Sequence, residues 1–294
     1  MDALSPDPIA ARLAALEQRL AGMERVLREI RQLVGPFAVP MGPDALLVQT
    51  IHGVKYMVPT HDMVMTPQLV VYRQWEAQLS ALLPRLCPQG GVFVDVGANF
   101  GYFTCLLAAR MGRSGGGRII AIEPNPELLD LLRTNIGINW SGAPVRVEPV
   151  AVAETPGEMM LTIPDGRFAN GTLAPLEAEG RELRAHRVSV TRLDDLLRQE
   201  PRIDLIKIDV EGFEPAVLRG GAETLARDGL KLVLEWSVPQ LREAGFDPME
   251  TPRLLEAAGY RLFDAEAGTD PASGKPLTAA DFTARSYCNL LAVR

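Results

Sequence analysis

The first apolar pattern along the chain is a helical seam with heptad spacing. Apolar residues recur in alternating steps of four and three, the repeat of a coiled coil. They are Ile9, Leu13, Leu16, Leu20, Met23, Leu27, Ile30 and Val34. Charged residues occupy the other faces, and Gly35-Pro36 ends the predicted helix. The pattern predicts a short coiled coil that joins copies of the chain into a homo-oligomer. An amphipathic helix lying on its own domain is the alternative.

The next segment, residues 36–65, mixes proline and glycine with short β-branched runs, so we expect a loop or a small hairpin there. Residues 67–83 carry apolar positions at core spacing and predict one helix that ends before Pro84. We expect residues 1–35 to form the N-terminal helix, 36–90 a linker and cap segment, and 91–294 the main domain.

Strands and helices alternate from residue 91 onward. Apolar strand patterns occupy residues 92–96, 119–122, 145–150, 205–210, 232–235, 260–263 and 287–293, and helical patterns separate most of them. This alternation predicts an α/β fold with a doubly wound, mainly parallel sheet. Residues 158–163 and 187–190 predict an inserted hairpin around the loop 165–176. Because ligands of such folds bind beyond the carboxyl ends of the strands, we expect the insertion to shape a substrate pocket.

Composition narrows the classes of function. The formal net charge is −7 and no long Lys/Arg run is present, so nucleic acid is a poor candidate partner. Cys87, Cys105 and Cys288 lie far apart, which fits neither a zinc site nor a disulfide framework. The chain has no basic-then-apolar leader and no apolar run of membrane-spanning length. We therefore expect a soluble cytoplasmic protein with no membrane span.

A glycine loop follows the strand 92–96 and carries the first chemical signal. Its sequence, Asp95 to Gly101, departs from the dinucleotide pattern because Asn99 stands where a second glycine admits a pyrophosphate. The loop offers a carboxylate, backbone that can approach a ligand, and a helix start with free N–H groups. These features suit S-adenosyl-L-methionine, which has no diphosphate. Glu123 ends the next strand and can accept hydrogen bonds from ribose hydroxyls.

The second signal is a charged run in an apolar strand. If residues alternate faces, Lys207, Asp209 and Glu211 share one side, where unpaired charges are costly to bury. We interpret them as functional. An ion pair between Lys207 and Asp209 that only supports the sheet is the alternative.

Together these motifs resemble the FkbM family of S-adenosyl-L-methionine-dependent methyltransferases. The resemblance rests on the loop 95–101, the Glu-Pro-Asn-Pro turn 123–126 and the run 207–214 (Lys-Ile-Asp-Val-Glu-Gly-Phe-Glu), and it extends over residues 75–289. It implies a seven-stranded Rossmann-like sheet and methylation of hydroxyl oxygens, often on sugars or on glycosylated or polyketide products. It also implies that S-adenosyl-L-methionine is held by Asp95, Gly97, Asn99, Gly101, Glu123 and Asn125, with Glu154 near the adenine.

By the same resemblance Asp209 and Glu211 face the methyl group and the acceptor. We expect one of them to act as general base, with Lys207 fixing the carboxylates. A Mg²⁺ ion held by Asp209, Glu211 and Glu235 is an alternative way to acidify the hydroxyl. His52, His61 and His186 lack metal-ligand spacing. Rival functions are a cofactor-binding scaffold that has lost catalysis, a nicotinamide oxidoreductase and a nucleic-acid methyltransferase.

Overall fold

The computed structural model describes residues 8–33, 38–113, 116–140, 143–164, 171–173, 183–267 and 274–294. Its centre is a seven-stranded sheet in the order β12-β13-β11-β10-β4-β5-β6. The strands are β4 (Val92–Val96), β5 (Arg118–Ile122), β6 (Val145–Glu148), β10 (Leu205–Ile208), β11 (Lys231–Ser237), β12 (Arg261–Asp264) and β13 (Tyr287–Val293). All pairs are parallel except those of β13, which runs antiparallel to β11 and β12. The predicted fold class is confirmed.

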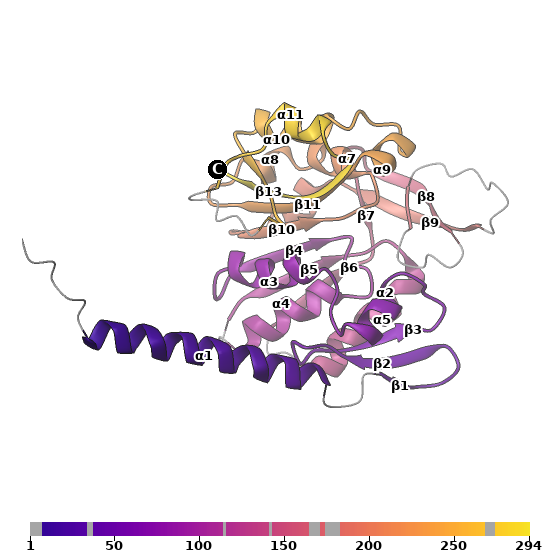
Figure 1. Ribbon diagram of the computed structural model, residues 1–294. Helices are drawn as coiled ribbons and strands as arrows, with labels where there is room; N and C mark the ends of the chain where they lie inside the picture. The colour runs from indigo at the N-terminus through magenta and orange to yellow at the C-terminus, as the bar shows by residue number, and fades with distance from the viewer. Residues whose placement is uncertain are drawn as a thin grey trace, which may run out of the picture.

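Each face of this sheet is covered by its own helices (Figure 1). Alternate residues of the strands point to opposite faces, which gives two separate apolar cores. The first core contains Phe93 and Leu205 together with α3 (Ala77–Leu86), α4 (Tyr102–Arg113) and α5 (Pro126–Asn139). The second contains Val94 and Ile206. Its helices are α6 (Leu193–Leu197), α7 (Glu214–Arg219), α8 (Ala222–Leu225), α9 (Val238–Glu243), α10 (Glu250–Ala257) and α11 (Ala279–Thr283).

The segment before the main sheet is a folded cap. It forms an antiparallel sheet of β1 (Ala38–Pro40), β2 (Ala45–Gln49) and β3 (Lys55–Pro59). Asn135 of α5 fastens this sheet to the main domain, because its side-chain amide accepts from Met57 N at 2.6 Å and donates to Met57 O at 3.1 Å. Val48, Tyr56 and Val58 join the same core as α4. The segment therefore packs on the same core as the main sheet.

The single helix expected over residues 67–83 is wrong. The chain forms α2 (Met65–Val71) and α3, separated by a turn in which Arg73 and Glu76 adopt the left-handed region at φ 57° and 39°. Pro84 lies inside α3, which continues to Leu86. The break matters for function because it turns Glu76 toward the site described below.

The predicted insertion is a hairpin of β8 (Gly157–Pro164) and β9 (Leu183–Thr191), and β7 (Ala151–Val152) pairs in parallel with β9. Most of the loop expected to shape the acceptor pocket, residues 165–170 and 174–176, lies outside the described residues. Glu127 at the start of α5 holds the hairpin by bonding to Arg184 and to His186, whose Nε2 lies 2.7 Å from Glu127 Oε1.

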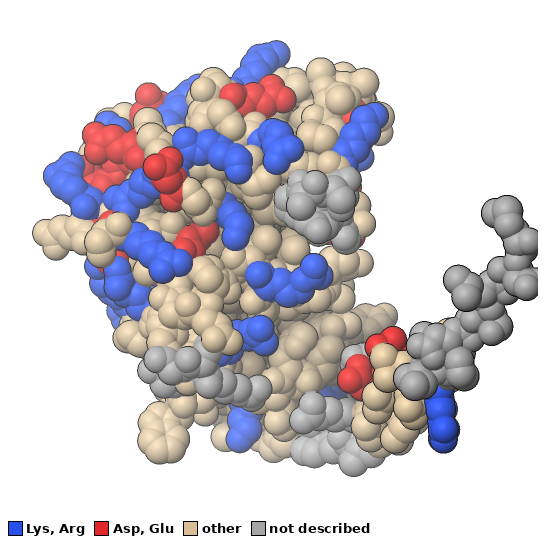
Figure 2. Space-filling model, turned by 90° about the vertical axis from the view of Figure 1, so that its left-hand side faces the viewer, with Lys and Arg blue, Asp and Glu red and all other residues tan. Residues whose placement is uncertain are grey.

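The N-terminal helix α1 (Pro8–Leu33) lies at the edge of the molecule in both Figure 1 and Figure 2. The expected stop at Gly35-Pro36 lies outside the described residues. None of the described helices combines the length and the apolar character needed to cross a membrane.

Candidate active site

The site lies where the loops after β4 and β10 touch. These strands are neighbours, with Val96 in register with Ile208, so their carboxyl ends meet at one edge of the sheet. Gly97 adopts φ +80°, and a Cβ placed on it would lie 1.8 Å from the carbonyl oxygen of Asp209. The close approach requires glycine. Gly101 has the same requirement, since its Cβ would lie 2.6 Å from Leu132 Cδ1 at φ +92°.

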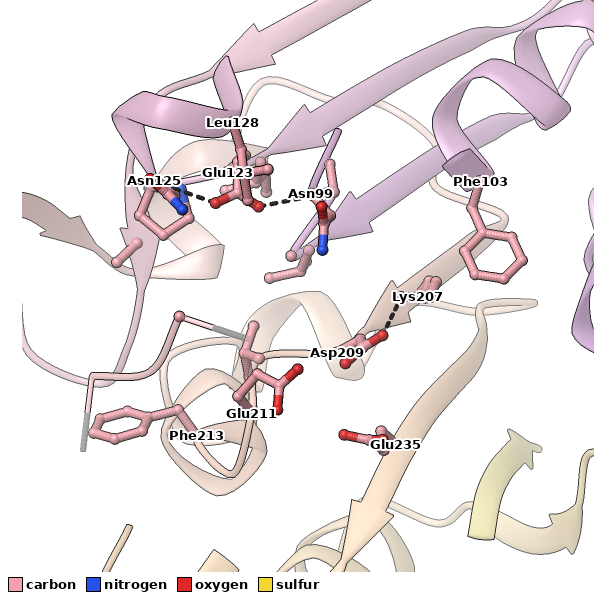
Figure 3. A pocket seen from close by; sticks show the side chains of 18 of the residues that line it. Asn99, Phe103, Glu123, Asn125, Leu128, Lys207, Asp209, Glu211, Phe213 and Glu235 are labelled. Carbon is pink, nitrogen blue, oxygen red and sulfur yellow. Dashed lines mark hydrogen bonds and ion pairs between the residues drawn. The ribbon is translucent and has the colours of Figure 1, made fainter. Parts of the chain in front are cut away.

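Glu123 joins the loops that follow β4 and β5. Its Oε2 accepts from Asn99 N at 2.7 Å, and its Oε1 accepts from Asn125 N at 2.8 Å (Figure 3). Burial raises the pKa of Glu123 to about 7, and the two backbone N–H groups oppose that rise. The carboxylate lines the cavity and is fixed from both sides, so it can present its remaining lone pairs to a ligand without reorganising.

Asn125 has two roles in one side chain. Its Oδ1 caps α5 by accepting from Glu127 N at 3.0 Å. Its Nδ2 is buried and has no hydrogen-bond partner within the described residues. A buried donor without a partner is costly, so this atom fits a ligand acceptor in the adjoining cavity.

Asp95 is not part of the cavity wall. It is 1% exposed and points to the face that α4 covers, where its Oδ2 accepts from Thr104 Oγ1 at 2.6 Å. Its register partner on β10 is Lys207. Burial raises the pKa of Asp95, and the nearby Lys207 ammonium lowers it. Asp95 therefore acts on the site through Lys207.

Lys207 and Asp209 form the central ion pair. Lys207 Nζ donates to Asp209 Oδ2 at 2.8 Å, with 5% of the lysine side chain and 29% of the aspartate side chain exposed. Burial alone would lower the pKa of Lys207, but Asp209, Asp95 and Glu76 raise it, so the amine stays charged. The ammonium also lies 5.1 Å from the centre of the Phe103 ring. The buried Lys207 ammonium thus holds the Asp209 carboxylate at the cavity.

Asp209 and Glu211 were predicted to share one side of a strand with Lys207, and this prediction is wrong. Strand β10 ends at Ile208, so both residues lie in the following turn. Glu211 has a left-handed backbone at φ 55°, and its Oε2 accepts from Gln240 Nε2. Gly212 continues the turn at φ +97°, where a Cβ would lie 2.5 Å from the carbonyl oxygen of Gln240. The turn nevertheless brings both carboxylates to the cavity.

Two further carboxylates complete the site. Glu235 of β11 points to the same region as Asp209 and Glu211 (Figure 3), and Glu76 lines the cavity from the cap. Glu235 and Glu76 each have a buried Oε2 without a hydrogen-bond partner within the described residues. Burial and the Asp209 charge raise the pKa of both groups. From the sequence, Glu235 was predicted only as an alternative metal ligand, and Glu76 was not predicted as a site residue.

The cavity has a volume of about 280 Å³ and two chemically distinct halves. One half is bounded by the loops around Gly97, Glu123 and Asn125 and by apolar residues at Val150–Val152, Leu161 and Phe213. The other is bounded by Trp75, Tyr102, Phe103 and Tyr287 together with the carboxylates described above. In Figure 3 Asp209 lies between Glu123 and Asn125 on one side and Glu235 on the other.

Some predicted site residues lie elsewhere. Glu154 is absent from the cavity lining and faces Arg219 on the surface, 3.5 Å from its Nη1. The apolar residues just before it, Val150–Val152, line the cavity. His186 bonds Glu127 on the hairpin and does not line the cavity. Across the described ranges, no three carboxylate, imidazole or thiol side chains form a group able to hold a metal ion.

Comparison with known proteins identifies the family. The profile of the Methyltransferase FkbM domain matches residues 95–262. Methyltransferase sdnD of Sordaria araneosa is 29% identical over 220 residues, covering 65% of this chain and 82% of that protein. Hexuronic acid methyltransferase AglP of Haloferax volcanii is 27% identical over 187 residues, covering 62% and 69%.

The crystal structure of Methyltransferase FkbM from Methylobacillus flagellatus matches at 16% identity with a TM-score of 0.40, covering 69% of this chain and 43% of that chain. The family assignment rests on the profile, which spans the glycine loop, Glu123 and the Lys207–Asp209 pair and more than half of the sequence. This chain belongs to the FkbM family of S-adenosyl-L-methionine-dependent methyltransferases.

Proposed function

We propose that this enzyme methylates a hydroxyl oxygen, on a sugar or on a glycosylated or polyketide-type acceptor. The observation that carries the proposal is the Asp209 carboxylate, oriented by a buried lysine and lying between the two halves of one cavity. The named similarity to a hexuronic acid methyltransferase supports a sugar acceptor. In this scheme residues 1–35 are an assembly helix, 36–90 a cap and 91–294 the catalytic domain.

The first half of the cavity fits the cofactor. Gly97 and Asn99 bring backbone to the ligand, Glu123 would accept from the ribose hydroxyls, and Val150 to Val152 would pack on the adenine. The unpartnered Asn125 Nδ2 supplies a donor for a cofactor acceptor atom. Gly101 contributes by allowing α4 to start close to α5. When bound, S-adenosyl-L-methionine supplies an electrophilic methyl group on a sulfonium centre.

The second half of the cavity fits a hydroxyl-bearing acceptor. Ionised carboxylate oxygens only accept hydrogen bonds, and Glu76 and Glu235 each have a buried Oε2 without a partner among the described residues. Acceptor hydroxyls would satisfy them by donating, and Trp75 and Tyr287 provide ring faces beside them. Such carboxylates paired with aromatic rings match the donors and the apolar faces of a polyol.

Asp209 is our candidate for the general base. Lys207 engages Oδ2, so Oδ1 is available to take the proton as the acceptor oxygen attacks. Glu211 is held by Gln240 and would orient the acceptor beside it. Because the ion pair fixes Asp209 before the acceptor arrives, little reorganisation accompanies proton transfer.

Labelled S-adenosyl-L-methionine incubated with a panel of glycans and small metabolites tests this function. We expect label in a methyl ether, located by mass spectrometry of the product. Label on nitrogen or carbon would contradict the hydroxyl assignment. Cofactor binding by calorimetry without turnover on any acceptor would favour the scaffold alternative.

The buried acids predict how stability depends on pH. Burial raises the pKa of Glu76 from 4.5 to about 7, so the folded state binds more protons than the unfolded chain between these values. The stability it contributes is complete below about pH 4.5 and is lost as the pH rises through about 7. We expect the Tm of the cofactor-free enzyme to fall between pH 5 and pH 8, roughly, and Glu76→Gln to flatten that fall. If the Tm of Glu76→Gln falls as steeply with pH as that of the original enzyme, Glu76 is not the group responsible.

A further inference from the structure

The N-terminal helix presents an apolar seam to solvent. The side chains of Leu13, Leu16, Leu20, Met23, Leu27 and Ile30 are between 49% and 61% exposed. They lie on one stripe of a helix 26 residues long. Contiguous exposed apolar surface of this kind marks an interaction site. The charged residues beside the seam indicate which partner binds there.

Heptad positions follow directly from the seam. Leu13, Leu20 and Leu27 occupy position a, and Leu16, Met23 and Ile30 occupy position d. Arg12 and Arg19 then lie at position g, and Glu17 and Glu24 lie at position e. All four of these charged residues are exposed. Over these two heptads the two edges of the seam therefore carry opposite charges, whereas the third heptad has Val26 at position g and Arg31 at position e.

We propose that α1 forms a parallel, in-register coiled coil with further copies of this chain. In that arrangement position g of one helix meets position e of the next heptad on its neighbour, so Arg12 faces Glu17 and Arg19 faces Glu24 of another copy. An antiparallel arrangement would bring g to g and e to e, placing arginine against arginine and glutamate against glutamate. The charges therefore select both the partner, which is a second copy, and its direction. This inference does not depend on the acceptor.

Cross-linking of the full chain tests direction and register. The native cysteines are buried, so an introduced cysteine on α1 is the accessible one among the described thiols. In oxidised glutathione, Leu13→Cys should form a disulfide with the same cysteine of another copy, because residue 13 of one helix lies beside residue 13 of its neighbour in a parallel, in-register coil. The control Gln18→Cys, on the outer f position, should not. Cross-linking only when Leu13→Cys is mixed with Ile30→Cys, the a-to-d pairing of an antiparallel coil, would overturn the parallel assignment.

Charge reversal tests the pairing independently. Arg12→Glu with Arg19→Glu should raise the dissociation constant by about tenfold or more, since glutamate then faces glutamate. Adding Glu17→Arg and Glu24→Arg to the same chain should restore the original dissociation constant, because glutamate at position g then faces arginine at position e. An antiparallel coil would keep like charges together in every variant, so no change across the series would reject the proposal. Sedimentation equilibrium should give a multiple of the chain mass, and a monomer would overturn the inference.

Discussion

Replacing Asp209 with asparagine is expected to lower turnover by about 10²- to 10⁴-fold, the usual contribution of a general base. The amide keeps the shape of the side chain but cannot accept the proton of the acceptor hydroxyl. Affinity for S-adenosyl-L-methionine should change by less than about threefold, because the proposed cofactor contacts come from Glu123 and the glycine loop. Single-turnover kinetics and calorimetry measure the two quantities separately.

A matched substitution controls for the loss of one negative charge. Asp130→Asn changes an aspartate whose side chain is 91% exposed on α5, and it should leave turnover unchanged. Glu211→Gln should lower turnover less than Asp209→Asn does. Glu211 is hydrogen-bonded to Gln240, whereas Asp209 is the carboxylate paired with Lys207. If turnover is unchanged in both Asp209→Asn and Glu211→Gln, the proposed base is wrong.

The main sheet could be predicted because its signal is local. Strands buried on both faces appear as short apolar runs, and each run that was predicted corresponds to one of the seven strands. The glycine loop was equally visible, since Gly97 and Gly101 are the residue type that a positive φ demands.

The acceptor side of the site could not be predicted because it depends on contacts between distant segments. Glu76 reaches the cavity through a left-handed residue between two helices, where apolar spacing alone indicated one continuous helix. Glu211 likewise depends on a turn that packs against Gln240. Asp95 remains a predicted cofactor ligand. Its carboxylate accepts from Thr104 Oγ1 of α4 and is absent from the cavity lining, a placement that a strand-end position does not indicate.

Replacing Gly97 with alanine is expected to destabilise the fold more than any surface change. The new Cβ would lie 1.8 Å from the carbonyl oxygen of Asp209, which is backbone and cannot swing aside. The left-handed φ of +80° adds strain for any residue with a Cβ. We expect a loss of about 3 to 5 kcal/mol in the free energy of unfolding, with the loops after β4 and β10 forced apart.

Gly137→Ala is the matched control because Gly137 lies in α5 with nothing within 4 Å of its added Cβ. That variant should gain about 0.5 to 1 kcal/mol, since alanine favours the helix. Denaturant unfolding measures both changes, and calorimetry with S-adenosyl-L-methionine should show binding weakened in Gly97→Ala and kept in Gly137→Ala. Because the clash moves Asp209 as well as the cofactor loop, residual turnover in Gly97→Ala should fall further than its remaining cofactor binding. A Gly97→Ala enzyme with normal stability would mean that the two loops do not touch and that the cavity they enclose has been wrongly assigned.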